Sequence, residues 1–173
     1  MTQLVDADLT LRRFRDTDRD ALVVLADNPR VSRFLADRFP DPYTLADAEA
    51  WLATTATEVR VCNFAVEWQG RLVGGAGLIP LADVYSGTAE IGYWLGEPYW
   101  GKGLATRAVA LLAAYALDEL LFIRLQANVF AENSASMRTL EKNGFVREGV
   151  LRKHVRKHGV VTDAVLYAKL RNP

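Results

Sequence analysis

A short glycine-containing segment is the first place where this chain can hold an anionic ligand. Gly101 and Gly103 flank Lys102, and a nearly all-apolar helix is predicted to begin directly afterwards at Leu104. Glycine lets the backbone approach a ligand closely, and the first amides of a helix carry partial positive charge without acceptors in the helix. Such a loop can bind a diphosphate, with the lysine ammonium adding a contact. An ordinary tight turn would have the same glycines, so this pattern alone leaves both interpretations open.

One carboxylate lies where a charge is unexpected. Glu90 falls in the predicted strand 88–95, within an otherwise apolar run just before the glycine segment. An ionised side chain in apolar surroundings is costly unless it is paired or takes part in chemistry. Glu90 is therefore a candidate proton acceptor. The alternative is a carboxylate paired with an arginine at the edge of the strand.

Two histidines and one cysteine carry less information. His154 and His158 are four residues apart, but they fall in or beside a predicted strand and turn without a third ligand motif. Surface histidines and no metal site are therefore expected. Cys62 lies between apolar residues in a strand-like run, which indicates a core thiol rather than a nucleophile.

A basic run and an aromatic segment are candidates for contact with a partner or substrate. The basic run consists of Arg152, Lys153, Arg156 and Lys157. It is either a solvated edge that discourages strand addition or a surface where an acidic substrate or peptide docks. The aromatic segment is a candidate wall of the substrate site, although Trp51 fits the core equally well. Its members are Phe34, Phe39, Tyr43 and Trp51.

The elements that must position these residues are strands interspersed with helices. Apolar alternation predicts strands at 9–14, 62–68, 71–79, 88–95, 123–129, 150–157 and 160–170. Helical periodicity and capping residues predict helices at about 21–25, 45–57, 104–120 and 134–142. Glycines at 74, 75 and 77 indicate close packing of one strand against another element. We therefore expect an α/β (α+β) fold with a mixed, mainly antiparallel sheet of six or seven strands and about four helices.

Composition limits the class of protein. The chain has 173 residues, half of them hydrophobic, and its 21 Lys and Arg balance 21 Asp and Glu. We expect a single domain over residues 1–173 and no global field that would attract nucleic acid or an anionic membrane. The single cysteine suits a reducing compartment, and no leader-like or membrane-spanning apolar stretch is present in the sequence. A cytoplasmic protein without a membrane partner is predicted.

The glycine segment resembles the cofactor motif of the GCN5-related N-acetyltransferase superfamily. That motif is Gln/Arg-x-x-Gly-x-Gly/Ala, and the matching run here is Trp-Gly-Lys-Gly-Leu-Ala at 100–105. Trp100 replaces the usual Gln or Arg, a departure typical of the RimJ/RimL branch of ribosomal-protein N-terminal acetyltransferases. Gly-Tyr-Trp-Leu at 92–95 and Tyr-Trp-Gly-Lys-Gly at 99–103 are similar to that branch, as are the runs at 133–136 and 140–145. The resemblance extends from Leu11 to Tyr167.

The resemblance implies where acyl-CoA binds. The sheet is expected to splay open after the strand that contains residues 93–95, so that pantetheine pairs with backbone groups there, while the side chains of Tyr93 and Trp94 pack in the core. The implied cofactor-binding residues are Tyr93, Trp94, Leu95, Trp100, Gly101, Lys102, Gly103, Leu104, Ala105 and Asn133.

The resemblance also implies catalytic roles. Glu90 is similar to the general base of histone-acetylating members, which carry a similar Ala-Glu-Ile run. Ser136 resembles the serine that protonates the coenzyme A thiolate in the RimL branch, although Asn and Ser at a helix start are above all capping residues. Tyr167 is a lesser candidate for the proton donor and more typical of a packed strand aromatic.

These observations predict an enzyme, an acyl-CoA-dependent N-acyltransferase. It would transfer an acetyl or other short acyl group from acyl-CoA to a primary amine, by direct transfer in a ternary complex and without a metal. A protein N-terminal amine is the first acceptor considered, and a small amine is the alternative. A non-catalytic acyl-CoA-binding module is the alternative of a different class. The sequence leaves open the acceptor, the acyl length and the oligomeric state, with a homodimer among the options.

Overall fold

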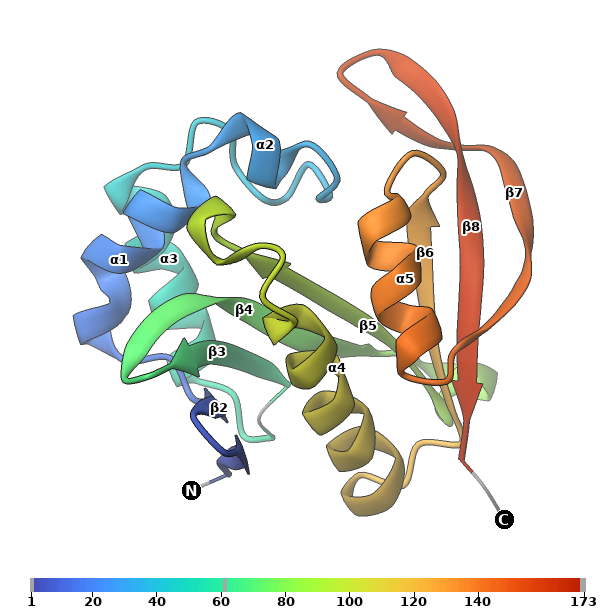
Figure 1. Ribbon diagram of the computed structural model, residues 1–173, viewed down its shortest axis with the longest axis horizontal. Helices are drawn as coiled ribbons and strands as arrows, with labels where there is room; N and C mark the ends of the chain where they lie inside the picture. The colour runs from blue at the N-terminus through green and yellow to red at the C-terminus, as the bar shows by residue number, and fades with distance from the viewer. Residues whose placement is uncertain (1, 61, 172–173) are drawn as a thin grey trace. The chain divides into compact units, whose positions relative to one another are not determined.

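The computed structural model describes residues 2–60 and 62–171, which contain one mixed sheet (Figure 1). Its eight strands run in the order β1-β2-β3-β4-β5-β6-β8-β7. Their bounds are β1 Leu4–Asp6, β2 Leu9–Arg12, β3 Asn63–Trp68, β4 Arg71–Pro80, β5 Thr88–Leu95, β6 Arg124–Phe130, β7 Val146–Lys157 and β8 Val160–Leu170. β5 and β6 pair in parallel, whereas β1–β2, β2–β3, β3–β4, β6–β8 and β7–β8 are antiparallel. The predicted mixed, mainly antiparallel fold is confirmed.

The sheet contains a strand that the sequence pattern does not predict. β1 has three residues, too few for a period of two to be recognised, and it forms because the chain reverses at Ala7, where φ is +50°. Leu4 then pairs with Leu11 of β2. This strand accounts for the difference between the eight strands observed and the six or seven predicted.

Four α-helices begin and end close to the predicted positions, and a further short helix, α2, forms at Pro29–Ser32, where no separate helix is predicted. Thr44 caps α3 through a capping box with Asp47, as the sequence indicates. The helix predicted at 104–120 consists of α4 followed by one π-helical turn, η4. The bounds are α1 Arg19–Ala26, α2 Pro29–Ser32, α3 Leu45–Ala56, α4 Leu104–Ala114, η4 Tyr115–Glu119 and α5 Ser134–Lys142, with 3-10 turns η1 Asp16–Asp18, η2 Asp83–Tyr85 and η3 Glu97–Tyr99.

The two predicted hairpin turns form with the expected backbone. Gln69 and Gly70 have φ of +51° and +74°, and His158 and Gly159 have φ of +49° and +79°. Two successive residues with positive φ match the right-handed twist of the flanking strands, which is why such two-residue turns favour glycine. The β3–β4 and β7–β8 connections are therefore as predicted.

Two compact units are distinguished by their internal contacts. Unit 1 comprises residues 2–60, 62–77 and 93–112, and unit 2 comprises 78–92 and 113–171. In unit 1, buried residues of α1, α3 and the strands β3 and β4 form one core that includes Leu22, Leu52 and Leu72. In unit 2, Leu125 of β6, Leu140 of α5 and Ala164 of β8 are fully buried. The single domain expected over residues 1–173 remains a prediction.

Candidate functional site

The end of β5 lies very close to β4 in unit 1. A Cβ added at Gly74 would come within 2.1 Å of the carbonyl oxygen of Trp94, and the amide of Gly96 donates to the carbonyl of Val73 at 2.9 Å. The close packing predicted for the glycines of β4 is therefore confirmed. Because backbone groups of successive strand residues face opposite sides, those of Tyr93 and Leu95 are turned away from β4.

The tryptophan of the predicted cofactor motif holds one of these backbone groups. Trp100 Nε1 donates to the carbonyl oxygen of Leu95 at 2.7 Å, although 40% of the Trp100 residue surface is exposed. The guanidinium carbon of Arg30 lies 5.6 Å from the centre of the Trp100 ring, and Arg30 also forms an ion pair with Glu97. The indole is thus fixed by a hydrogen bond at its nitrogen and by a cation near its ring. Motif spacing does not reveal this contact.

The glycine loop has the conformation expected of an anion-binding turn. Gly101 and Gly103 have φ of +73° and +75°, and no heavy atom lies within 4 Å of a Cβ built at either position. Backbone conformation, rather than lack of space, therefore favours glycine here. The first hydrogen bond of α4 runs from the amide of Arg107 to the carbonyl of Gly103 at 3.1 Å. The exposed loop at 101–103 thus leads directly into the start of α4, an arrangement that suits an anionic group such as a diphosphate.

The lysine of the loop rests on aromatic rings of unit 1. Lys102 Nζ is 5.4 Å from the centre of the Trp68 ring and 5.6 Å from that of Tyr99. These are cation–π distances, so the ammonium already has a favourable place on the protein. Contact between Lys102 and a phosphate remains a prediction.

An ion-pair cluster fixes the first turns of α4. Arg107 Nε lies 2.6 Å from Asp6 Oδ2, and its Nη1 lies 2.9 Å from Asp8 Oδ1. The hydrogen bond that Arg107 donates to Asp6 is the main cause that raises the pKa of Arg107. Leu104 is buried, whereas Ala105 is only half-buried. Sequence reasoning missed this anchor because its partners lie about a hundred residues away, with no local signal to join them.

Glu90 lies in unit 2 at the last paired position between β5 and β6. The parallel register ends at Glu90 and Gln126. Glu90 Oε1 accepts long hydrogen bonds of 3.4 Å from Gln126 Nε2 and from Asn128 Nδ2. Neutral amides therefore hold this partly buried carboxylate.

The arginine partner considered for Glu90 is absent from the described part of the chain. Arg124 is the basic residue of β6, and it forms a two-pronged pair with Glu148, at 2.8 and 2.6 Å. Its Nε donates instead to Gln126 Oε1 at 3.1 Å. Of the two interpretations of Glu90, the structural ion pair is thus wrong, and a role as proton acceptor stays a prediction.

The start of α5 contains the other predicted catalytic side chain. Asn133 Oδ1 accepts from the amide of Ser136 at 3.1 Å, which confirms that one of these two residues caps the helix. Both residues are half-buried and both belong to unit 2. Contact of Asn133 with the cofactor and proton donation by Ser136 remain predictions.

Tyr167 is a packed strand residue, as the sequence indicates. Only 2% of it is exposed, and its hydroxyl donates to Glu141 Oε1 at 2.7 Å. Burial and the Glu141 carboxylate raise the pKa of the Tyr167 hydroxyl. A proton held in this way is harder to give up, so Ser136 remains the preferred donor.

Most of the aromatic segment packs in or against the core of unit 1. Tyr43 is buried, and burial together with the Asp47 charge raises its pKa to about 12. Trp51 packs against the core edge-on to Phe14, at 5.8 Å between ring centres. Phe39 and Trp94 also pack against this core, with their ring centres 5.3 Å apart. Packing in the core is thus confirmed for Trp94.

Residues 2–60 and 62–171 contain neither a candidate metal site nor a candidate membrane-spanning helix. No group of three or more His, Cys, Asp and Glu side chains there could hold a metal ion. None of the helices described has the length and apolarity needed to cross a bilayer. His154 and His158 are both exposed, as predicted.

Comparison with known proteins places this geometry in a family. Residues 8–146 match the family described as "Acetyltransferase (GNAT) domain". The chain is 30% identical to the uncharacterized N-acetyltransferase p20 of Bacillus licheniformis, over 99% of this chain and 97% of that protein. It is 36% identical to the ribosomal-protein-serine acetyltransferase of Escherichia coli, over 48% of this chain and 46% of that protein. A GNAT-family acetyltransferase of Bacillus anthracis shares the fold, with a TM-score of 0.86, 24% identity and coverage of 98% and 99%.

Proposed function

Because this chain belongs to the GNAT family of acetyltransferases, we propose that it transfers the acetyl group of acetyl-CoA to the N-terminal amine of a protein. Acetyl-CoA is the co-substrate, and the reaction is a direct transfer within a ternary complex. The proposal assigns the enzyme to the RimJ/RimL branch of the family. The alternative acceptor is a small-molecule amine.

One contact carries the assignment to this branch. Trp100 stands where the family usually has Gln or Arg, and its indole nitrogen donates to the Leu95 carbonyl at 2.7 Å. The tryptophan therefore contacts the strand whose backbone is proposed to pair with pantetheine. The 36% identity to an acetyltransferase of ribosomal-protein serine supports the same assignment.

Backbone groups of unit 1 are proposed to bind the donor. Tyr93 and Leu95 present theirs away from β4, toward the side where the pantetheine amides would lie. The diphosphate would occupy the loop at 101–103, where positive-φ glycines leave the backbone uncovered and a helix of eleven residues begins. Trp94, Trp100, Leu104 and Ala105 would shape this segment, and Lys102 would leave its aromatic rings to approach a phosphate.

Side chains of unit 2 are proposed to move the protons. The neutral amine attacks the thioester carbonyl, a C–N bond forms, and the C–S bond breaks. Glu90 would take the proton that the amine loses, directly or through water, because its carboxylate has amide partners and, among the described residues, no neutralising cation. Ser136 would give or share a proton with the departing thiolate of coenzyme A, and Asn133, which caps α5, would contact the cofactor.

The pKa values of amines favour an N-terminal acceptor. Only a neutral amine attacks a thioester, and an α-amine has a pKa near 7.7 to 8.0, against about 10.4 for lysine. At neutral pH roughly a few hundred-fold more α-amine than lysine amine is therefore uncharged. A carboxylate base therefore deprotonates an N-terminal amine more readily than a lysine amine.

A competition among acceptors tests the proposal. The purified enzyme would be given acetyl-CoA and a peptide that contains a free N-terminus and an internal lysine, with mass mapping of the product. A matched peptide with a blocked N-terminus serves as control, and a polyamine and an aminoglycoside represent small acceptors. We expect acetylation at the α-amine and none on the blocked peptide. Acetylation of lysine alone, or of the small amines alone, would remove the enzyme from this branch while leaving the reaction type intact.

A further inference from the structure

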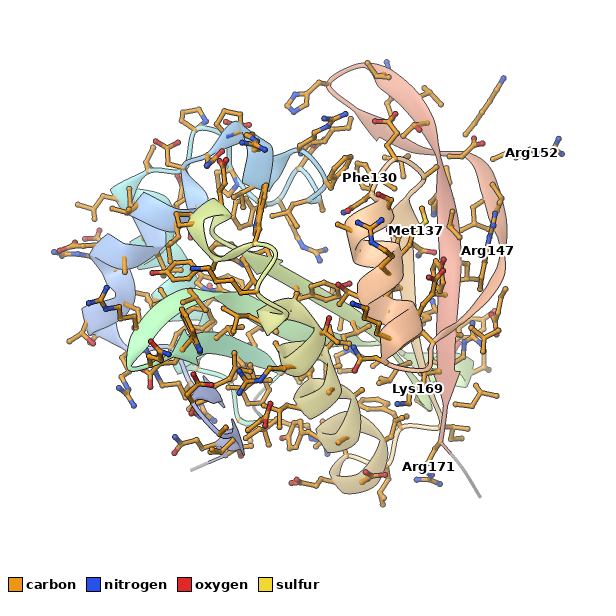
Figure 2. All side chains as sticks on the ribbon, viewed as in Figure 1. Phe130, Met137, Arg147, Arg152, Lys169 and Arg171 are labelled. Atoms are coloured by element: carbon orange, nitrogen blue, oxygen red, sulfur yellow. The ribbon has the colours of Figure 1, made fainter. Side chains whose placement is uncertain are left out.

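The β7–β8 hairpin concentrates positive charge in a chain whose charges otherwise balance. β7 contains five Lys and Arg residues and one Glu, whereas the whole chain has 21 basic and 21 acidic residues. Three of these cations, Arg152, Lys153 and Arg156, are exposed and lie near the turn of the hairpin. We call these three residues the basic tip. In Figure 2 Arg152 extends outward from β7.

The two carboxylates of the hairpin accept hydrogen bonds from Arg124 and from a backbone amide, not from the side chains of the basic tip. Glu148 accepts two hydrogen bonds from Arg124, the main cause that holds its pKa below the ordinary value. Asp163 Oδ1 accepts from the backbone amide of Lys153 at 2.7 Å. Within residues 2–60 and 62–171, no ion pair neutralises Arg152, Lys153 or Arg156. The three cations of the basic tip are therefore outside any ion pair of the described residues, with the Asp163 carboxylate beside the Lys153 backbone.

The backbone of the tip favours contact through side chains rather than strand addition. β7 is the edge strand of the sheet, and its pairing with β8 is interrupted between Leu151 and Val155. Lys153 has φ of +53° within this interruption, and its amide is satisfied by Asp163. Such bulges and edge lysines oppose the addition of a further strand. A partner would thus meet the charged groups of the tip, not extend its ladder.

We propose that the basic tip docks an acidic segment of the acceptor protein. The proposal rests on the proposed function, because a protein acceptor has residues beyond its reacting amine that can be recognised. Complementary charge would raise the rate of encounter and select among N-termini that the chemistry alone treats alike. A nucleic acid fits less well, since the chain has no net charge and three cations form a small footprint.

Two peptides and two variants test the docking. The peptides share their first residues and a free N-terminus, and differ downstream in an Asp/Glu-rich segment or its Asn/Gln counterpart. The variant Arg152→Gln/Arg156→Gln removes two charges of the tip. Its control, Arg71→Gln/Lys142→Gln, removes two exposed charges that lie outside the hairpin and outside the proposed site. Initial rates give kcat and KM, and fluorescence anisotropy gives the affinity for labelled peptides that are already N-acetylated.

We expect the tip variant to raise KM for the acidic peptide about 5- to 20-fold, with kcat nearly unchanged, as two exposed ion pairs allow. KM for the neutral peptide and all values of the control should stay within about twofold. Anisotropy should show the same loss, and added salt should erase the difference between the peptides.

The docking would be overturned if, for each of the two peptides, the tip variant had the same KM as the wild type. It would also be overturned by a single-stranded RNA of equal charge that binds the tip as tightly as the acidic peptide. Should no peptide be acetylated, the proposed function fails, while anisotropy with the acidic peptide still decides whether the tip binds it.

Discussion

The two units place their functional groups in different ways. In unit 1 the donor would be held by main-chain atoms, at the end of β5 and in the loop at 101–103. In unit 2 the proposed chemistry depends on the side chains of Glu90 and Ser136. A backbone site needs glycines and close strands, whereas a side-chain site needs particular partners around each group. The comparison teaches that binding and proton transfer should fail separately when each unit is altered.

The largest effect is expected from Gly103→Val. Gly103 has φ of +75°, where a β-branched residue is strained, and its side chain would cover the backbone that is proposed to bind the diphosphate. We expect the affinity for acetyl-CoA to fall about 10²- to 10³-fold, which is about 3 to 4 kcal/mol. Isothermal calorimetry with acetyl-CoA measures this loss.

Gly159→Val is the matched control for this change. Gly159 has φ of +79° in the β7–β8 turn, and a Cβ there would meet nothing within 4 Å, as at Gly103. The two variants should lose similar unfolding free energy, about 1 to 3 kcal/mol. Only Gly103→Val should lose the cofactor. Unchanged acetyl-CoA affinity in Gly103→Val would show that the loop is an ordinary turn.

The next effect concerns Glu90→Gln, which probes the chemistry of unit 2. The amide keeps an oxygen that can accept from Gln126 and Asn128 but cannot take a proton. At neutral pH kcat should fall about 10²-fold or more, with partial recovery at high pH, where more of the amine is already neutral. Steady-state rates measured from about pH 6 to about pH 9.5, a range that includes the pKa of an α-amine, test this recovery.

Two further variants sharpen the interpretation of Glu90. Glu119→Gln makes the same chemical change at an exposed site of unit 2 and should leave the rate unaltered. Ser136→Ala should lower kcat less than Glu90→Gln, and a donor with a better leaving thiol should relieve the defect. Near-full activity of Glu90→Gln at every pH would leave proton removal to water or to another group.

The smallest effect is expected from Trp100→Phe in unit 1. Phenylalanine keeps an aromatic ring beside Arg30 but loses the N–H that donates to Leu95. One hydrogen bond is worth about 0.5 to 1.5 kcal/mol, so KM for acetyl-CoA should rise about 2- to 10-fold with kcat nearly constant. Trp100→Gln, which restores an N–H donor, should recover part of this loss. An unchanged KM in Trp100→Phe would mean that the indole hydrogen bond does not position the strand.

In unit 1, local sequence patterns predicted the loop at 101–103 but not the side-chain contacts that hold the neighbouring elements in place. The turn and the helix are recognised from the sequence because their patterns are local. The turn has closely spaced glycines at positive φ, and α4 has a periodic apolar face. The pairing of Arg107 with Asp6 and Asp8 spans about a hundred residues and has no such local pattern. The contact of Trp100 with Leu95 likewise depends on the path of the intervening turn.

In unit 2, too, the sequence did not identify the partners of the charged groups. The sequence identifies Glu90 as an ionisable side chain in an apolar strand. Both an ion pair with an arginine and a role as proton acceptor would explain it. Only the folded chain shows that Arg124 pairs with Glu148. The cap at Asn133 was predictable because its donor, the amide of Ser136, lies three residues away.

The narrow space at Gly74 has a practical consequence for changing the acyl group that this enzyme transfers. Even a methyl group there would lie 2.1 Å from the Trp94 carbonyl and 2.8 Å from the Leu95 Cα, so the strand would have to shift. Diversity introduced at position 74 would therefore yield mostly misfolded clones. A combinatorial library for new acyl donors should keep this glycine constant and vary the half-buried side chain of Tyr93, where the backbone can stay in place.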